Sequence, residues 1–216
     1  MKPLADCRLY VILDAGYLAP IAMPEMARAV IRGGADILQL RAKNWPRERV
    51  RELAHLLVET TQPAGVPLII NDHPSIAADV GAAGAHIGQD DGTVQAARGA
   101  LRQGQWIGKS THSEAQIRAT LAETPDYIAV GPVHPTPTKP DYKAVGLNLI
   151  RHAAAAVKSA PFFCIGGIKL ENVDEVLESG ATRIVVVSGI LQAPDPEGYT
   201  AQLKSKLEGV QAKGRP

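Results

Sequence analysis

Short runs of β-forming residues alternate with helical patterns along the whole of this 216-residue chain. Each run is short and apolar, as expected of a strand buried on both faces in a parallel sheet. The predicted strands are 9–13, 37–40, 68–70, 85–87, 106–108, 127–130, 162–165 and 184–187. Helical patterns cover 24–32, 46–60, 74–80, 93–101, 113–121, 147–157, 171–178 and about 196–207. Eight βα units in a chain of this length predict an α/β fold, a single (β/α)8 TIM barrel.

The alternative fold is a flavodoxin-like open sheet with a small appendage. No Gly/Ser-rich linker and no change in composition divides the chain. We therefore expect one TIM-barrel domain over residues 1–216, with its core at about 8–208 and a C-terminal tail, 209–216, that frays.

The composition of the chain argues against nucleic acid and membranes as binding partners. A net charge of +1, with 21% charged residues, gives no long-range attraction to nucleic acid or to an anionic membrane. Neither a signal peptide nor a transmembrane run is recognisable, so we expect a cytoplasmic protein. Aromatic residues make up only 4% of the chain, which predicts an aliphatic core, and Cys7 and Cys164 are expected to be free thiols. The sequence is compatible with a homo-oligomer but defines no oligomeric state.

Polar residues cluster directly after the predicted strands, where a barrel of this kind carries its active site. Besides the motifs discussed below, these are Gln89, Asp90, Ser110, Thr111, His112 and Ser188-Gly189. His86 lies inside a strand pattern and is expected to be an interior residue with satisfied hydrogen bonds. No histidines or cysteines have the spacing of a zinc site, and no Ser/His/Asp order stands out.

Two groups of residues have the chemistry of phosphate binding. A proline-stiffened loop after the sixth predicted strand carries Thr136, Thr138 and Lys139, which offer two short donors and a point charge. An ordinary solvated surface turn is the alternative. Gly166-Gly167 and Val187-Ser188-Gly189 follow the last two predicted strands, where barrels commonly bind phosphate. For both segments, a tight turn from strand to helix that needs positive φ is the alternative.

Asp72 and Asp91 end neighbouring strands, so their carboxylates can converge. Two hard oxygen ligands suit Mg²⁺, which takes its other ligands from water and substrate phosphates. The alternative is that each residue caps the helix that follows it. Arg41 and Lys43 are expected to face the barrel mouth and to require an anion there, unless an ion pair with Asp72 or Glu48 satisfies them.

These motifs, taken in order, resemble those of the thiamine phosphate synthase family over nearly the whole chain. They are Gln39-Leu-Arg-x-Lys43, Asn71-Asp72, His86-x-Gly-Gln-x-Asp91, Gly108-x-Ser110-Thr-His112, Gly131-Pro132 through Thr136-x-Thr138-Lys139, Ile165-Gly-Gly-Ile168 and Val187-Ser188. The first strand departs from the family pattern, because Leu13 precedes Asp14 where a small polar residue is usual.

The resemblance implies an enzyme that transfers an aminomethylpyrimidine group from its diphosphate to the nitrogen of a thiazole phosphate, giving thiamine phosphate and pyrophosphate. It also implies Mg²⁺ as cofactor, held by Asp72 and Asp91, and two small molecules as partners. The implied pyrimidine diphosphate site is Gln39, Leu40, Arg41, Ala42, Lys43, Asn71, Ser110 and Lys139, of which Arg41, Lys43, Ser110 and Lys139 are the catalytic residues. The implied thiazole phosphate site is Thr136, Pro137, Thr138, Gly167, Val187 and Ser188.

Three alternatives stay open. A related thiazole tautomerase is expected to lack the complete acidic pair and Thr-x-Thr-Lys motif. A sugar-phosphate isomerase would need an acid–base pair or a His/Asp metal cluster that we do not find. A non-catalytic binder of thiamine precursors would not need a site for pyrophosphate departure.

Overall fold

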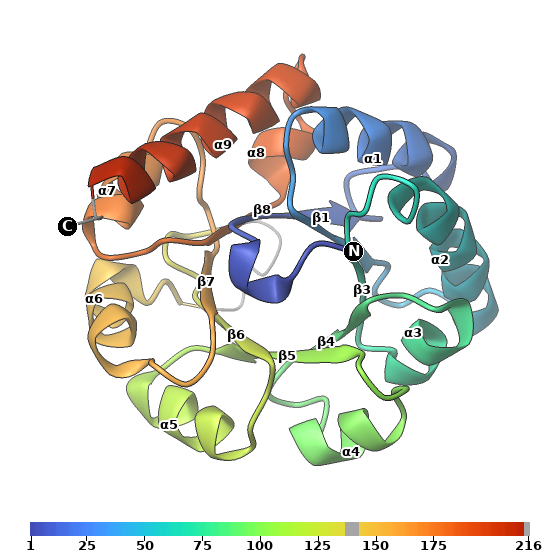
Figure 1. Ribbon diagram of the computed structural model, residues 1–216, viewed down its shortest axis with the longest axis horizontal. Helices are drawn as coiled ribbons and strands as arrows, with labels where there is room; N and C mark the ends of the chain where they lie inside the picture. The colour runs from blue at the N-terminus through green and yellow to red at the C-terminus, as the bar shows by residue number, and fades with distance from the viewer. Residues whose placement is uncertain (137–142, 214–216) are drawn as a thin grey trace.

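Eight parallel strands close into a barrel, surrounded by helices, in the computed structural model (Figure 1). The structure describes residues 1–136 and 143–213. Each strand pairs with the next one along the chain, and β8 pairs with β1 to close the ring. The predicted (β/α)8 barrel is therefore confirmed, and the open-sheet alternative is wrong.

The strands coincide closely with the predicted apolar runs. They are β1 (Leu9–Asp14), β2 (Ile37–Arg41), β3 (Leu68–Asn71), β4 (Gly84–Ile87), β5 (Trp106–Thr111), β6 (Tyr127–Val130), β7 (Phe162–Ile165) and β8 (Ile184–Val186). Several extend at the carboxyl end into polar residues, such as Asp14, Arg41 and Asn71. Those extensions carry polar side chains into the mouth of the barrel.

The helices fill the outer ring in the order that the sequence predicts. They are α1 (Met23–Arg32), α2 (Arg47–Thr61), α3 (Pro74–Val80), α4 (Val94–Gly99), α5 (Glu114–Ala122), α6 (Gly146–Ala156), α7 (Val173–Glu178), α8 (Ser188–Leu191) and α9 (Pro196–Lys213). The sequence did not predict the four-residue α8, and α9 continues beyond the predicted end at residue 207. Among the described residues, none of these helices has the length and apolar character needed to cross a bilayer.

Two apolar layers hold the barrel together. The layer between strands and helices is almost entirely aliphatic, as the composition predicts. The barrel interior is different, because Tyr10, Tyr127 and Phe163 fill its centre and contact one another edge-on, with ring centroids 5.5–6.0 Å apart. The expectation of a wholly aliphatic core is therefore wrong for the interior, where three large rings occupy space that many small side chains would otherwise fill.

The amino-terminal end of the barrel is closed by the short 3-10 helix η1 (Leu4–Asp6), which lies across the centre of the ring in Figure 1. Nearby, the buried carboxylate of Asp36 pairs with the ammonium groups of Lys2 and Lys204 and accepts the backbone N–H groups of Arg8 and Leu9. Burial acts to raise the pKa of Asp36, but these partners outweigh it, so the pKa lies below its usual value.

Candidate active site

A cavity opens at the carboxyl ends of the strands, on the face opposite η1. Most of the residues that the sequence assigned to ligand binding line it, although they come from six separate segments. They are Gln39, Arg41, Asn71, Ser110, Thr136, Gly167, Val187 and Ser188. The parallel barrel brings them together, because every strand ends at the same rim.

Other assigned residues lie elsewhere. Leu40 and Ala42 are buried in the layer between strands and helices, so their side chains point away from the cavity. Lys43 lies two residues beyond the end of β2, and its side chain is exposed. Pro137, Thr138 and Lys139 lie outside the described residues. Strand alternation explains the burial of Leu40 and Ala42, because successive side chains point to opposite faces of the sheet and Gln39 and Arg41 face the cavity.

Arg41 has an ionic partner that the sequence did not predict. Its Nη1 lies 2.5 Å from Oδ2 of Asp14, on the adjacent strand and at the paired register position. The other oxygen of Asp14 accepts the backbone N–H of Gly16 at 2.7 Å. The alternative in which Asp72 or Glu48 is the ionic partner of Arg41 is therefore wrong, because Asp14 holds that place. Asp14 fixes the guanidinium at the cavity wall while its remaining N–H groups stay available to a ligand.

The acidic pair lies beside this arginine, at the ends of β3 and β4. Asp72 follows β3 with φ of 61°, a left-handed conformation that Asp tolerates better than most residues. Oδ2 of Asp91 accepts the backbone N–H of Gly88 at 2.7 Å. Burial, followed by the charge of Asp91 and a hydrogen bond with it, raises the pKa of Asp72 to about 6. The two carboxylates therefore repel each other in the absence of a cation.

Neither aspartate caps a helix. Thr93 caps α4, with its hydroxyl accepting the N–H of Ala96, and the residue at the N-cap of α3 is His73, whose side chain makes no capping bond. The capping alternative is therefore wrong for both residues. Among the residues that the structure describes, no cluster of three or more His, Cys, Asp or Glu side chains could hold a metal. A cation at this pair would need ligands from water or substrate.

The glycine turn after β7 is a tight turn with positive φ, and it also lies at the cavity, where a phosphate was predicted to bind. Gly166 and Gly167 have φ of 103° and 64°, so the backbone needs residues without a side chain. A Cβ atom on Gly166 would lie 2.4 Å from Pro132, and one on Gly167 would lie 2.7 Å from the Cβ of His134. The turn packs closely against the loop after β6 and also lines the cavity. After β8, the first residue of α8 is Ser188, which sits at the same rim.

The interior of the cavity contains residues that sequence reasoning undervalued. His86 is buried and hydrogen-bonded, as predicted, but it also lines the cavity, together with Tyr10 and His112. Their signal in the sequence is alternation within a strand: Tyr10 lies in register with inward-facing positions, whereas its neighbours Leu9 and Val11 face the helices. An inward-facing Tyr or His within a strand is thus a candidate for the cavity floor.

The fold and the position of the cavity define a (β/α)8-barrel protein with its site at the carboxyl ends of the strands. The family of thiamine monophosphate synthases matches residues 9–190, and the chain belongs to this family. The family predicted from the sequence motifs is confirmed.

Individual relatives agree with this assignment. The thiamine-phosphate synthase of Thermus thermophilus is 42% identical over 205 residues, which cover 94% of this chain and 98% of the relative. That of Streptomyces avermitilis is 44% identical over 211 residues, covering 94% and 95%. The solved structure of thiamine phosphate pyrophosphorylase from Pyrococcus furiosus superimposes with a TM-score of 0.86 at 30% identity, covering 94% and 96%.

Proposed function

We propose that this chain is a transferase that joins 4-amino-2-methyl-5-hydroxymethylpyrimidine diphosphate to 4-methyl-5-(2-hydroxyethyl)thiazole phosphate. The products are thiamine phosphate and pyrophosphate. Family membership supports this reaction, and so does the cavity, which combines polar, cationic and glycine-turn elements on one rim. Both substrates are charged phosphate esters that cross membranes poorly, so the proposed reaction belongs in the cytoplasm, where such intermediates are kept.

The chemistry needs a good leaving group more than a nucleophile on the protein. The C–O bond between the pyrimidine methylene and the diphosphate breaks, and its electron pair leaves with pyrophosphate. The pyrimidine amino group donates electron density to the resulting cation, and the lone pair of the thiazole nitrogen then forms the new C–N bond. The protein has to stabilise the departing anion, exclude water and align both substrates.

Mg²⁺ is the proposed cofactor, held by Asp72 and Asp91. The fit rests on the hard oxygen donors of the pair and on the raised pKa of Asp72, which burial and then the adjacent charge of Asp91 cause and which a bound cation would lower. When bound, Mg²⁺ neutralises charge on the diphosphate oxygens. Two protein ligands suffice, because Mg²⁺ usually keeps waters and takes substrate phosphates as further ligands.

The proposed pyrimidine diphosphate site lies on the β2, β3 and β5 side of the cavity. Arg41, fixed by Asp14, would contact the diphosphate, and Lys43 would approach it from solvent. Asn71 and Ser110 would offer polar atoms from the neighbouring strands, and Gln39 would contact the pyrimidine. Because their side chains face the helices, Leu40 and Ala42 would contribute backbone atoms only. We assign Lys139 to the leaving pyrophosphate from its sequence motif alone.

The proposed thiazole phosphate site lies on the β6, β7 and β8 side. Thr136, with Pro137 and Thr138 of the same loop, would contact the thiazole phosphate. Gly167, Val187 and Ser188 would surround its phosphate, since glycine permits close approach of the backbone. The two substrates would then meet above the cavity floor, each held by a different half of the barrel.

The convergence of both residue sets on one cavity carries the proposal. The test is to incubate the pure protein with Mg²⁺ and both substrates, and to measure thiamine phosphate and pyrophosphate by chromatography and mass spectrometry. We expect both products in equal amounts, and neither when one substrate is omitted. A protein that isomerises or only binds the thiazole phosphate would leave the pyrimidine diphosphate unconsumed, which would contradict the proposal.

A further inference from the structure

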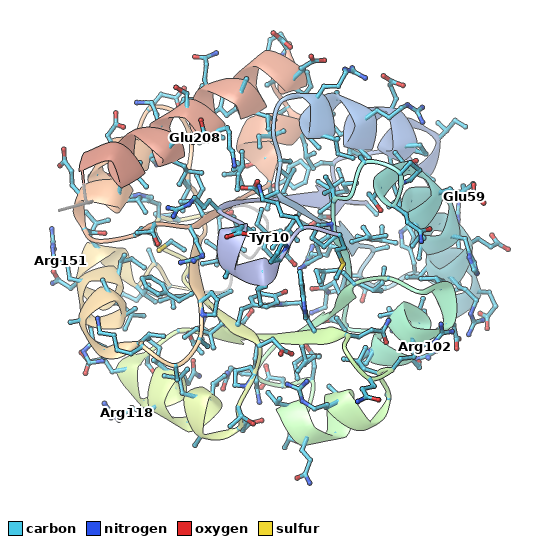
Figure 2. All side chains as sticks on the ribbon, viewed as in Figure 1. Tyr10, Glu59, Arg102, Arg118, Arg151 and Glu208 are labelled. Atoms are coloured by element: carbon cyan, nitrogen blue, oxygen red, sulfur yellow. The ribbon has the colours of Figure 1, made fainter. Side chains whose placement is uncertain are left out.

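At the floor of the cavity, five buried side chains form one hydrogen-bonded chain across the barrel interior. Nε2 of Gln39 donates to the phenol oxygen of Tyr10 at 2.6 Å. The hydroxyl oxygens of Tyr10 and Tyr127 are 3.0 Å apart. The oxygen of Tyr127 is 3.2 Å from Nδ1 of His86, whose Nε2 is 2.9 Å from Oγ of Ser110. Figure 2 shows Tyr10 near the centre of the ring.

The donor at one end sets the direction of the first two bonds. Nε2 of Gln39 can only donate, so the oxygen of Tyr10 accepts. The single proton of Tyr10 then points to the oxygen of Tyr127, which is the acceptor at hand. In the reverse order, Tyr10 would accept twice and bury an unused O–H group, which is costly in a residue only 1% exposed. Burial raises the pKa of both phenols well above their usual value, so both keep their protons at neutral pH.

The same argument sets the direction of the remaining hydrogen bonds, from Tyr127 through His86 to Ser110. Tyr127 uses its oxygen to accept from Tyr10 and its proton to donate to Nδ1 of His86. A neutral imidazole with an acceptor at Nδ1 carries its proton on Nε2. That N–H donates to Oγ of Ser110, so Ser110 does not spend its own proton on His86. Because Ser110 lines the cavity, its hydroxyl proton is presented to a ligand.

Packing holds the central ring of this chain in place. A Cβ atom on Gly108 would lie 2.1 Å from Cζ of Tyr127, so the absence of a side chain at this position makes room for the ring. His86 stacks on the same ring with centroids 5.6 Å apart and an interplanar angle of 29°. Phe163 contacts it edge-on at 5.5 Å. The hydroxyl of Tyr127 is thus fixed between two partners rather than free to rotate away.

We propose that Tyr10 and Tyr127 are positioning residues that fix His86 as the Nε2–H tautomer and thereby make Ser110 a hydrogen-bond donor to the bound pyrimidine diphosphate. The ligand atom at Ser110 is accordingly an acceptor, either a ring nitrogen or a phosphate oxygen. Tyr10 anchors Gln39 at the same time, so one buried relay orients polar groups on both β2 and β5. The identity of the ligand rests on the proposed function, whereas the tautomer does not.

The tautomer can be measured in the free, full-length protein. Two-bond ¹H–¹⁵N correlation spectra of protein labelled in the histidine rings distinguish protonated from unprotonated nitrogens, and His86→Gln assigns the signal. We expect Nε2 of His86 to carry the proton in the wild type. Tyr127→Phe should change that pattern, whereas Phe163→Leu, which removes a neighbouring ring without a hydroxyl, should keep it. An Nδ1–H tautomer in the wild type overturns the proposal, whatever the activity.

A double-mutant cycle tests whether Tyr127 acts through Ser110. By calorimetry with the pyrimidine diphosphate and Mg²⁺, Tyr127→Phe should weaken binding about tenfold in the wild-type background. In a Ser110→Ala background the same change should cost less than about twofold, because the acceptor of the relay is gone. Equal losses in both backgrounds would show that Tyr127 only fills space and would overturn the positioning role. If the wild type binds no pyrimidine diphosphate, the proposed function fails and the NMR result still decides the relay.

Discussion

Asp14 and Arg41 stand opposite each other on β1 and β2, and their side chains form an ion pair of 2.5 Å at the wall of the cavity. Both are largely buried, with side-chain exposures of 4% and 14%. The aspartate thus takes part of the positive charge of Arg41 and in return fixes its position. The proposed contact of Arg41 with an anion is therefore rigid but partly neutralised.

Asp14→Asn should separate these two effects. The amide keeps an acceptor oxygen for the N–H of Gly16 but removes the negative charge beside Arg41. We expect tighter binding of pyrophosphate, because the guanidinium is no longer compensated, and a kcat about tenfold lower, because its position is no longer fixed. Product-inhibition kinetics measure both values. A variant with unchanged kcat and unchanged pyrophosphate inhibition would show that Asp14 is irrelevant to the reaction.

Asp72→Asn should lose turnover and gain stability. The pKa of Asp72 is raised to about 6, so its protonated form is favoured in the fold. The stability linked to this proton is complete below the ordinary pKa near 4 and is lost as pH rises through 6. Asparagine removes the charge and also tolerates the left-handed backbone.

In metal-free buffer at pH 7 we therefore expect the melting temperature of Asp72→Asn to exceed that of the wild type by a few degrees, or about 1 kcal/mol. Added Mg²⁺ should stabilise the wild type more than the variant, and turnover should fall on the order of 100-fold. Asp90→Asn, at an exposed neighbour, is the matched control and should change none of these. A variant as active as the wild type at limiting Mg²⁺ would exclude Asp72 as a ligand.

Ser188→Asp should weaken binding of the thiazole phosphate far more than binding of the pyrimidine diphosphate. The new carboxylate would stand at the rim after β8, where it opposes a phosphate dianion, whereas β2 and β3 lie on the other side of the cavity. We expect a loss of about 100-fold for the thiazole phosphate, measured by calorimetry on each ligand separately. Gln192→Asp adds the same charge at the exposed far end of α8 and should have little effect. Equal losses for both ligands would place the thiazole phosphate elsewhere.

Gly108→Ala should destabilise the protein by about 1–3 kcal/mol, because the added methyl group overlaps the ring of Tyr127 and the interior has no space to yield. Gly99→Ala is the control: a Cβ atom there meets no neighbour within 4 Å, and alanine favours the helix, so stability should hold or rise. Urea unfolding of the two variants gives the comparison. Equal stability of both would mean that the Tyr127 ring is free to move.

Asp36→Asn should destabilise the protein at neutral pH and flatten its response to acid. The folded pKa of Asp36 is lowered, so its contribution is present above the ordinary value near 4 and is lost as pH falls through the lower, folded value. We expect a loss of about 2 kcal/mol at pH 7, since Lys204 and Lys2 lose their partner. Asp79→Asn breaks an exposed pair with Arg51 and should cost less than about 0.5 kcal/mol. Urea unfolding at pH 7 and pH 4 measures both.

The sequence was sufficient for the fold because each strand is a short, isolated apolar run, and its period differs from that of the helix that follows. It also placed Gln39, Asn71 and Ser110 at the rim, since the topology alone brings strand ends together. It missed α8, because four residues are too few to show a period. It could not predict contacts between side chains that depend on which residues of two strands stand opposite each other.

Asp14 is such a residue, since its pairing with Arg41 depends on which positions of β1 and β2 stand opposite each other. Tyr10 and Tyr127 are 117 residues apart and look like ordinary core positions until their hydroxyls are seen to meet. The ring of a tyrosine favours burial, whereas its hydroxyl needs a hydrogen-bond partner. Only the three-dimensional arrangement shows whether a buried tyrosine has such a partner and which residue provides it.

The closure of the ring between β1 and β8 has a consequence for synthesis of the chain. During translation β1 emerges first, yet its second partner, Ile184–Val186, is made only after most of the other residues. The helix that covers this junction, α9, follows later still; its Glu197 pairs with Arg32 of α1, and Lys204 reaches Asp36. Until then β1 presents an unpaired edge to other nascent chains. β8 and α9, at the end of the chain, therefore protect the first strand from association with neighbouring molecules.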